Sequence, residues 1–293
     1  MRTAPSGMVV FRSTDVPDHC HVALIVPTRN SSRTLEACLR SLRQQTRACT
    51  VVVVDNHSTD DTEAIARQYA DVVAIAGPER SSQRNVGAGL TSASVLGFID
   101  SDMVLEPTVA EQAGRVLDAG AGAAIVPEVS FGDGFWAAVR RFERSFYGGC
   151  DAVEAARFYQ RDIFEGAGGF DETMGPGPED WDLTIRVRRA ADVARISARI
   201  WHDEGRLTFA DACAKKAYYS SGLQGFAQKH GRASLSVLGR PYIRRPWMLF
   251  SEGPLLGCGL VALKAGEAVS VVTATIRRCG LLRRNRTGPG GSQ

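Results

Sequence analysis

Two acidic segments and one histidine carry the side chains of this 293-residue chain that are best suited to chemistry. Asp100 and Asp102 stand two residues apart directly after an apolar run, and residues i and i+2 of extended backbone share a side. Two carboxylates placed in this way could hold one divalent cation and the phosphates it bridges, and such ligands suit Mg²⁺ or Mn²⁺. The pair could equally cap a following helix, because a D-x-D spacing is common in unrelated sequences.

The second acidic segment follows GPGP and contains Glu179, Asp180 and Asp182. One of these carboxylates could accept the proton of an attacking hydroxyl, or all three could stabilise the start of a helix through its macrodipole. His202 follows an apolar segment further along the chain and could be a metal ligand, a structural residue or a solvated one. Taken singly, none of these segments defines a function.

The elements that must position these side chains alternate between strand and helix. Continuous apolar runs predict strands at 22–26, 51–54, 72–76 and 95–99. Helical spacing of apolar residues predicts helices between them, near 32–42, 60–69 and 81–90. This alternation indicates a parallel sheet with helices on both faces, whose ligands bind at the carboxyl ends of the strands. The polar groups at 27–30, 55–58 and 100–102 should therefore meet at one edge.

The second half of the chain has a looser pattern. It predicts helices at 109–117, 135–146, 180–189 and 210–228, and strands at 123–126 and 193–196. Residues 157–178 are rich in glycine and acidic residues and predict a loop region facing the substrate. Gly87 and Gly89 lie within a predicted helix, not between the first strand and first helix, which argues against a dinucleotide fingerprint.

The composition excludes several classes of protein. A hydrophobic fraction of 44%, with 30 Gly and 7 Cys, is that of a globular protein, not a disordered, collagen-like or disulfide-rich one. A net charge of +3 argues against a nucleic-acid binder. The cysteines are scattered and odd in number, and residues 1–20 lack the apolar core of a secretory signal, so we expect a cytoplasmic protein.

Seven segments between about residues 22 and 228 together resemble the family 2 glycosyltransferases. In order along the chain, these segments are VALIVPTRNSSRTLEACLRSL, VVVVDNHSTDDT, RSSQRNVGA, LGFIDSDM, EGAGGFDE, PEDWDL and WHDEGRLT. The resemblance implies an enzyme, of the hexosyltransferase type, that transfers a sugar from a nucleotide donor with inversion. It also implies an α/β fold of the GT-A type, a mostly parallel Rossmann-like sheet flanked by helices, here followed by a helical C-terminal extension.

The resemblance further implies a role for individual residues. Asp102 would bind the Mn²⁺ or Mg²⁺ that bridges the diphosphate, and His202 would be another ligand of this ion. Asp180 would be the catalytic base, with Glu179 as the second candidate. The donor sugar and the acceptor would be lined by Gly168, Gly169, Asp171 and Trp181. The nucleotide-sugar site would comprise Pro27, Thr28, Asn30, Asp55, Asn56, Arg84, Asn85, Asp100 and Ser101.

The nucleotide base is less closely defined, because many members of that family have a second aspartate where this chain has Asn56. An amide both donates and accepts hydrogen bonds, whereas an ionised carboxylate only accepts. We expect a UDP-sugar as donor, with GDP- and dTDP-sugars as alternatives.

Two other functions match parts of the pattern. A sugar-phosphate nucleotidyltransferase also needs acidic metal ligands on an α/β sheet, but usually has a glycine-rich basic loop after its first strand. The segment PTRNSSRT contains no glycine. A non-catalytic protein that binds sugar nucleotides would not need the D-x-D pair, the Glu-Asp pair and the histidine together.

The C-terminal part of the chain differs in charge from the rest. Residues 240–293 contain nine Lys or Arg and two Glu, and two apolar pieces, 253–263 and 268–276, are separated by Lys264 and Glu267. Each piece alone is too short to cross a bilayer. This tail predicts either an interfacial anchor on an anionic membrane, or a pair of helices packed on the catalytic domain or in a homodimer interface. The anchor would imply a lipid-linked acceptor, and the packed helices a soluble one, such as a secondary metabolite.

These patterns predict three parts of the chain. An N-terminal segment, 1–20, precedes a catalytic domain, 21–235, and a basic, partly apolar helical tail, 236–293. Within the catalytic domain, the nucleotide-binding half spans about 21–105 and the acceptor half about 106–235. With the tail as an anchor, the protein would be peripheral at the inner face of the membrane.

Overall fold

The computed structural model describes residues 8–13, 20–151, 153–232, 234, 246–251 and 253–286. Parts of the predicted N-terminal segment, 1–7 and 14–19, lie outside the described residues. So do residues 235–245, 252 and 287–293 of the predicted tail and its junction.

Four parallel strands form the centre of the main sheet, as the sequence predicts. They lie in the order β4 (Val72–Ile75), β3 (Cys49–Asp55), β2 (Val22–Thr28) and β5 (Val95–Phe98). Val51 to Val54 have no exposed surface, because helices cover both faces of the sheet. Continuous apolar runs predicted these strands correctly for this reason.

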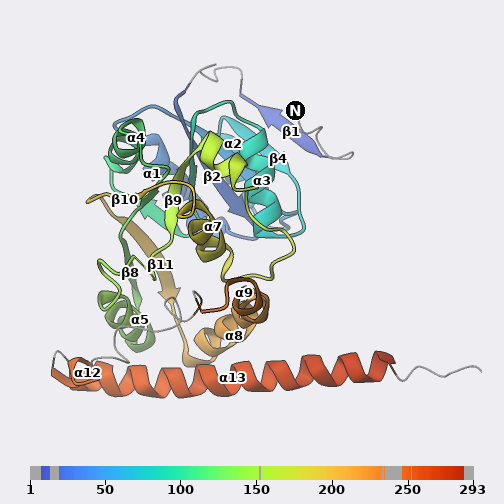
Figure 1. Ribbon diagram of the computed structural model, residues 1–293, viewed down its shortest axis with the longest axis vertical. Coiled ribbons are helices and arrows are strands. Elements are labelled where there is room, and N and C mark those ends of the chain that lie inside the picture. Colours follow the sequence, from blue (N-terminus) through green and yellow to red (C-terminus); the bar gives the residue numbers. More distant parts are fainter. Residues whose placement is uncertain are drawn as a thin grey trace, which may run out of the picture.

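Two layers of helices enclose this sheet (Figure 1). One face packs against α1 (Ser32–Arg43), α2 (Thr62–Tyr69) and α4 (Val109–Asp118). The other face packs against α3 (Arg80–Gly89), α6 (Arg161–Gly166) and α7 (Glu179–Val187). The parallel strands all end at the edge where α1 and α3 begin, so their carboxyl ends face one side of the molecule.

Four more strands complete the eight-stranded sheet, and two of them, β9 (Ala156–Gln160) and β1 (Val9–Arg12), run antiparallel to their neighbours. β9 lies between β5 and β7 (Ala123–Ile125), and β10 (Val193–Arg195) pairs parallel to β7. β1 adds to β4 at the opposite edge. The predicted loop region 157–178 is therefore wrong at its start, because β9 and α6 occupy it. The strand escaped prediction because its Arg157 is a buried charge in an otherwise mostly apolar run.

A second, three-stranded sheet was not predicted from the sequence. Its order is β6 (Met103–Leu105), β11 (Ile200–Arg206) and β8 (Glu128–Asp133), with β11 antiparallel to β6 and parallel to β8. His202 on β11 pairs with Met103 on β6. The small sheet thus brings His202 next to Asp102, which is 100 residues away in the sequence.

The helices that follow the second sheet also differ from the prediction. The helix expected at 210–228 is divided into α8 (Phe209–Tyr219), the 3₁₀ turn η1 (Ser220–Gly222) and α9 (Leu223–His230). Gly222 lies so close to the 175–178 loop that an added Cβ would be 2.3 Å from the carbonyl oxygen of Gly175. This close approach of two backbone segments accounts for the turn between the helices.

The two apolar pieces of the tail form one helix, α13 (Pro254–Arg286), preceded by the short α12 (Met248–Ser251). The prediction of two separate pieces is wrong because Lys264 and Glu267, which divide them in the sequence, are ion-paired to α5 (Phe135–Ser145). Figure 1 shows α13 along one side of the molecule, beneath α5 and α8 and far from β1. By length and composition alone, Pro254–Arg277 could cross a bilayer.

Candidate active site

The polar residues that follow β2, β3 and β5 meet at one edge of the sheet, as the sequence predicts. Asp100 and Asp102 lie in the short connection from β5 to β6, and Ser101 donates a 3.0 Å hydrogen bond to Ser31 at the start of α1. The backbone N–H of Asn56 donates to the carbonyl of Thr28, which joins the ends of β3 and β2. The edge is therefore one continuous polar surface.

Asp102 and His202 form a pair that fits a divalent cation. Oδ2 of Asp102 lies 3.1 Å from Nε2 of His202, and Nε2 is buried. Adjacent ligands of an octahedral ion at about 2.1 Å are separated by about 3 Å, which is close to this distance. Among the described residues, no third His, Cys, Asp or Glu joins them. The remaining ligands would come from substrate phosphates and water, as Mg²⁺ sites commonly allow.

Arg144 on α5 influences which nitrogen of His202 carries the proton. Its Nη2 lies 3.2 Å from Nδ1 of His202, and an arginine can only donate, so Nδ1 accepts in this arrangement. A cation at Nε2 requires the proton on Nδ1 instead. Arg144 must then release His202, and it already contacts Glu128 at 2.7 Å and Glu204 at 3.6 Å.

Arg84, which is fully buried, joins the acidic residues of α7 to those that follow β5. Its Nη1 donates to Asp180 at 2.9 Å and to Glu179 at 3.2 Å, and its Nη2 donates to Asp100 at 2.7 Å. This guanidinium lies beneath the site and holds three carboxylates. The resemblance implied a nucleotide contact for Arg84, but the structure places its charge against these acids.

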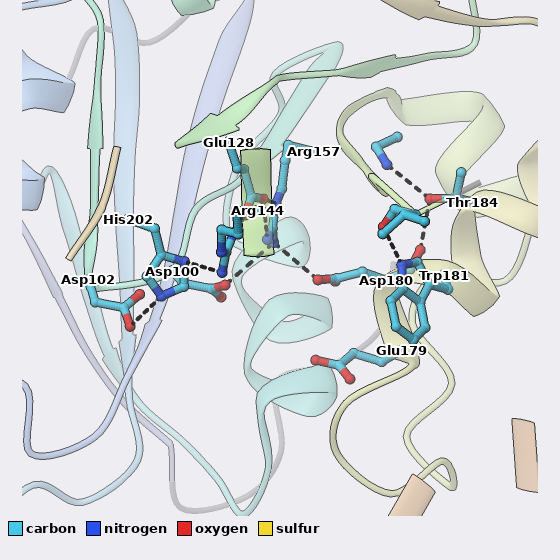
Figure 2. Close-up of polar contacts among 12 residues, drawn as sticks. Asp100, Asp102, Glu128, Arg144, Arg157, Glu179, Asp180, Trp181, Thr184 and His202 are labelled. Carbon is cyan, nitrogen blue, oxygen red and sulfur yellow. Dashed lines mark hydrogen bonds and ion pairs between the residues drawn. The ribbon is translucent and has the colours of Figure 1, made fainter. Parts of the chain in front are cut away.

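Arg157 on β9 forms a second bridge between the same elements (Figure 2). Its Nη1 lies 3.1 Å from Asp180 Oδ2 and 3.4 Å from Asp100 Oδ2, and its Nε donates to Glu128 at 2.8 Å. Asp180 and Asp100 therefore share both arginines. In each of these carboxylates, one oxygen contacts Arg84 and the other contacts Arg157.

The shared arginines leave the two carboxylates with different proton affinities. Burial raises the pKa of Asp180 and outweighs the attraction of Arg84 and Arg157, so the net pKa lies above that of an ordinary aspartate. Burial also raises the pKa of Asp100, but there the same two arginines prevail and hold the net pKa well below the ordinary value. Asp100 thus remains ionised, whereas Asp180 is the better proton acceptor.

Two adjoining hollows cover this network. The first, of about 320 Å³, is lined by Asp180, Glu179, Trp181 and His202, among others, and the second, of about 330 Å³, by Pro27, Thr28, Asn56 and Ser101. Both share Arg80, Asp100, Asp102 and Tyr219 in their walls. The acidic pair thus stands where the two hollows meet, with the predicted nucleotide residues on one side and the predicted base on the other.

Some predicted site residues stabilise loops. Asn30 accepts a hydrogen bond from the N–H of Thr59 at 2.9 Å, and Asp55 accepts one from the N–H of Ser58 at 2.8 Å. These contacts fix the loop after β3. Asn56 itself donates to the carbonyl of Pro78 at 2.7 Å.

Asn85, Gly168, Gly169 and Asp171 lie apart from the two hollows. They line a third hollow, together with Lys229, which forms a 2.6 Å ion pair with Asp171. Asn85 holds this loop through both atoms of its amide, donating to the carbonyl of Phe170 and accepting from its N–H, each at 2.9 Å. The structure does not bring this group together with Asp180.

Several charged residues of the site were not predicted from the sequence, notably Arg80, Glu128, Arg144 and Arg157. Arg80 lies in both hollows, and its guanidinium is 5.0 Å from the ring centre of Tyr219. For Arg157, a charge within the otherwise mostly apolar ARFYQ was an available signal. The others face partners that are distant in the sequence, and no local pattern marks them.

The comparisons with known proteins assign the chain to a class of protein, the glycosyltransferases. The family model described as "Glycosyl transferase family 2" matches residues 23–168, and the chain belongs to that family. The pre-mycofactocin glycosyltransferase of Mycobacterium tuberculosis is 27% identical over 82% of this chain and 55% of its own length. The validoxylamine A glucosyltransferase of Streptomyces hygroscopicus subsp. jinggangensis is 35% identical over 35% of this chain and 26% of its own length. The chain thus spans about half or less of the length of these relatives.

Solved structures share the fold at low sequence identity. The mannosyltransferase PcManGT of Pyrobaculum calidifontis, in complex with GDP-Man and Mn²⁺, gives a TM-score of 0.54 at 18% identity, covering 92% of this chain and 76% of that one. Residues 1–349 of S. aureus TarS, in complex with UDP-GlcNAc, give 0.52 at 16% identity, covering 88% and 92%. The chain therefore has a GT-A-type fold.

Proposed function

We propose that this glycosyltransferase is metal-dependent and inverting, and moves a hexosyl group from a nucleotide-sugar to an acceptor hydroxyl. The observation that carries the proposal is the placement of the Asp102–His202 pair and of Asp180 in one cavity, with Arg157 between them (Figure 2). Two neighbours in the fold support it, since PcManGT was solved with GDP-Man and Mn²⁺ and TarS with UDP-GlcNAc.

The donor that we propose is a UDP-sugar, with its nucleotide in the second hollow. Thr28, Asn56 and Ser101 line this hollow, and Oγ1 of Thr28 is buried without a hydrogen-bond partner. Asn30 and Asp55 support the hollow indirectly, by fixing the loop after β3. GDP- and dTDP-sugars remain the alternatives.

The proposed chemistry separates two developing charges. A cation on Asp102 and His202, when bound, would stabilise the negative charge that builds up on the leaving diphosphate. Asp180, in the same hollow as His202, accepts the proton of the attacking acceptor hydroxyl, and its raised pKa favours that transfer. Arg84 and Arg157 hold the Asp180 carboxylate in place. Attack on the face opposite the leaving group inverts the anomeric carbon, as in inverting glycoside hydrolysis.

The nucleotide and the acceptor are proposed to bind in different hollows. Residues 21–105 bind the nucleotide, and residues 106–235, which include Asp180 and Trp181, bind the acceptor. A lipid-linked hydroxyl and a soluble secondary metabolite are the two acceptor classes that the sequence suggests. The basic helical tail, 236–293, follows this catalytic domain in the sequence.

A screen of UDP-, GDP- and dTDP-sugars tests the proposal. Each sugar nucleotide is incubated with Mn²⁺, Mg²⁺ or EDTA, and release of nucleoside diphosphate is measured without acceptor. Slow hydrolysis of the donor by the enzyme then identifies both the preferred donor and the required metal. We expect release with one nucleotide and a metal, and none with EDTA or in Asp102→Asn. Pyrophosphate from a nucleoside triphosphate and a sugar phosphate would instead identify a nucleotidyltransferase. Nucleotide binding without turnover, even when a membrane extract supplies acceptors, would identify a non-catalytic protein.

A further inference from the structure

The outward face of α13 carries no charge over more than six turns. Val261, Val269, Val272 and Ile276 are each more than half exposed, at 51%, 66%, 57% and 65%. Their spacing places them on one side of the helix, together with the exposed Cys258, Ala262, Ala265 and Ala268. A helix that covers a soluble domain normally turns polar side chains to water. This face instead presents a continuous apolar stripe.

The opposite face of α13 is fastened to the catalytic domain. Leu260 and Leu263 are buried against α5 and α8. Lys264 forms a 2.7 Å ion pair with Glu143, and Glu267 forms one of 2.7 Å with Arg140. Both charges between Pro254 and Ile276 are thus used inside the protein.

These ion pairs argue against a membrane-spanning orientation. A span would detach the helix from α5 and place Lys264 and Glu267 near the bilayer centre, where each charge is costly. It would also remove Glu267 from Arg140 and Lys264 from Glu143, two partners of these largely buried charges, and leave the Arg140–Glu143 pair in place. The structure is therefore compatible with a helix that lies along a membrane surface, its inner face still packed on the domain.

Both ends of the stripe have the residues expected at a lipid interface. Trp247 and Phe250, in the segment that precedes α13, are 65% and 49% exposed, and tryptophan is enriched at membrane surfaces. Past Glu267 the chain has five basic residues and no acidic one: Arg277, Arg278, Arg283, Arg284 and Arg286. A basic residue near an anionic surface contributes about fivefold to partitioning.

We propose that α13 docks flat on an anionic membrane surface through this apolar stripe. The arginines favour anionic lipid over a second copy of the chain, which would bring its own basic charge to the interface. Lys264 and Arg140 also line the first hollow, so docking sets the acceptor side of the cavity close to the lipid. A lipid-carried hydroxyl is then the acceptor class that this geometry favours, a step that rests on the proposed sugar transfer.

Vesicle sedimentation of the full chain tests the docking independently of catalysis. The vesicles are phosphatidylcholine alone, or phosphatidylcholine with phosphatidylglycerol. The test variant, Val269→Glu with Val272→Glu, places two charges on the stripe. The matched control, Val9→Glu, places one at a 49%-exposed valine on β1, at the far side of the molecule (Figure 1).

We expect the wild-type chain and Val9→Glu to sediment with the anionic vesicles, weakly with neutral ones, and to be released by alkaline carbonate. The double variant should bind at least about tenfold more weakly, with an unchanged circular dichroism spectrum and melting temperature. Absence of binding to anionic vesicles, or equal binding by the double variant, would overturn the proposal. So would retention in carbonate, which indicates a span, or a wild-type dimer that the double variant dissociates, which indicates a second copy. Donor hydrolysis by the double variant, if the proposed function holds, stays at the wild-type rate.

Discussion

Asp180 depends on two buried arginines that also hold Asp100, so these four residues act as one unit. Arg84 is fully buried, and Arg157 is 7% exposed. Removing one partner of a buried charge pair costs about 3–5 kcal/mol, because the other charge is left uncompensated. The arginines are thus as necessary to the geometry of the site as the carboxylates that would touch the substrate.

Replacing one of these residues, in Arg157→Gln, should move the acid limb of the pH–rate profile. The base works only when ionised, so activity falls as the pH drops through the pKa of Asp180. Arg157 lowers that pKa, and its removal should raise it further, which shifts the limb to higher pH. The profile is measured as donor hydrolysis against pH, with Arg115→Gln, an exposed arginine on α4, as the control. A slower variant with an unmoved limb would mean that Asp180 is not the titrating base.

The loop that carries Gly168, Gly169 and Asp171 illustrates how one helix positions another segment. Asn85 on α3 makes two hydrogen bonds to the backbone of Phe170 and a third, of 2.8 Å, to Glu172. Phe170 in turn packs on Phe98 of β5, with ring centres 4.9 Å apart. The structure therefore gives Asn85 a role as an anchor.

Asn85→Ala should lower the free energy of unfolding by about 1–3 kcal/mol, because it leaves backbone groups of a half-buried loop unpaired. Faster hydrogen exchange at the Phe170 amide should accompany the loss, with nucleotide affinity unchanged. Urea unfolding, exchange and nucleotide titration measure these quantities. If the variant keeps full stability but binds nucleotide weakly, Asn85 contacts the nucleotide directly, as the family resemblance implies.

The contact of α5 with α13 should make stability depend on pH. Burial raises the pKa of Glu143, but Lys264 and Arg140 outweigh it and lower the net pKa to about 2. An unfolded glutamate titrates at about 4.3, so the ionised pair stabilises the fold above that pH. This stability, on the order of 3 kcal/mol, is lost as the pH falls from about 4.3 to about 2.

Glu143→Gln should therefore be less stable than the wild type at neutral pH and lose less stability between pH 4.3 and 2. Urea unfolding at several pH values measures both effects. The control, Glu63→Gln, breaks only an exposed i,i+4 pair with Arg67 and should change stability little. Parallel pH profiles for Glu143→Gln and the wild type would contradict this account of how α13 is held.

For the whole molecule, local sequence patterns predicted the elements that depend on local residue types and did not predict those that depend on distant partners. Strands β2 to β5 were found because residues such as Val51 to Val54 are apolar on both faces. The unpredicted elements contain charges whose partners lie elsewhere in the chain. Arg157 in β9 pairs with Asp180, and Lys264 in α13 pairs with Glu143, more than 100 residues away.

The same limit applies to the candidate site. The positions of Asp100 and Asp102 followed from a strand end, and their meeting with His202 followed from the family resemblance. Nothing in the sequence indicates the second sheet that places His202 beside Asp102, or that Arg84 and Arg157 both contact Asp180. Residue types and spacing thus located the acids, and only the fold shows which charges hold them.

The central claim is that Asp180 accepts the acceptor proton while the nucleotide binds in the adjoining hollow. A comparison of Asp180→Asn with the wild type tests it most directly, by measuring the affinity for nucleoside diphosphate with Mn²⁺ and the rate of sugar transfer or donor hydrolysis. Affinity within about threefold of the wild type, with a rate lower by about 10²–10⁴, is the predicted result. Equal loss of both in a variant that melts at the wild-type temperature would contradict the account, as would an unchanged rate.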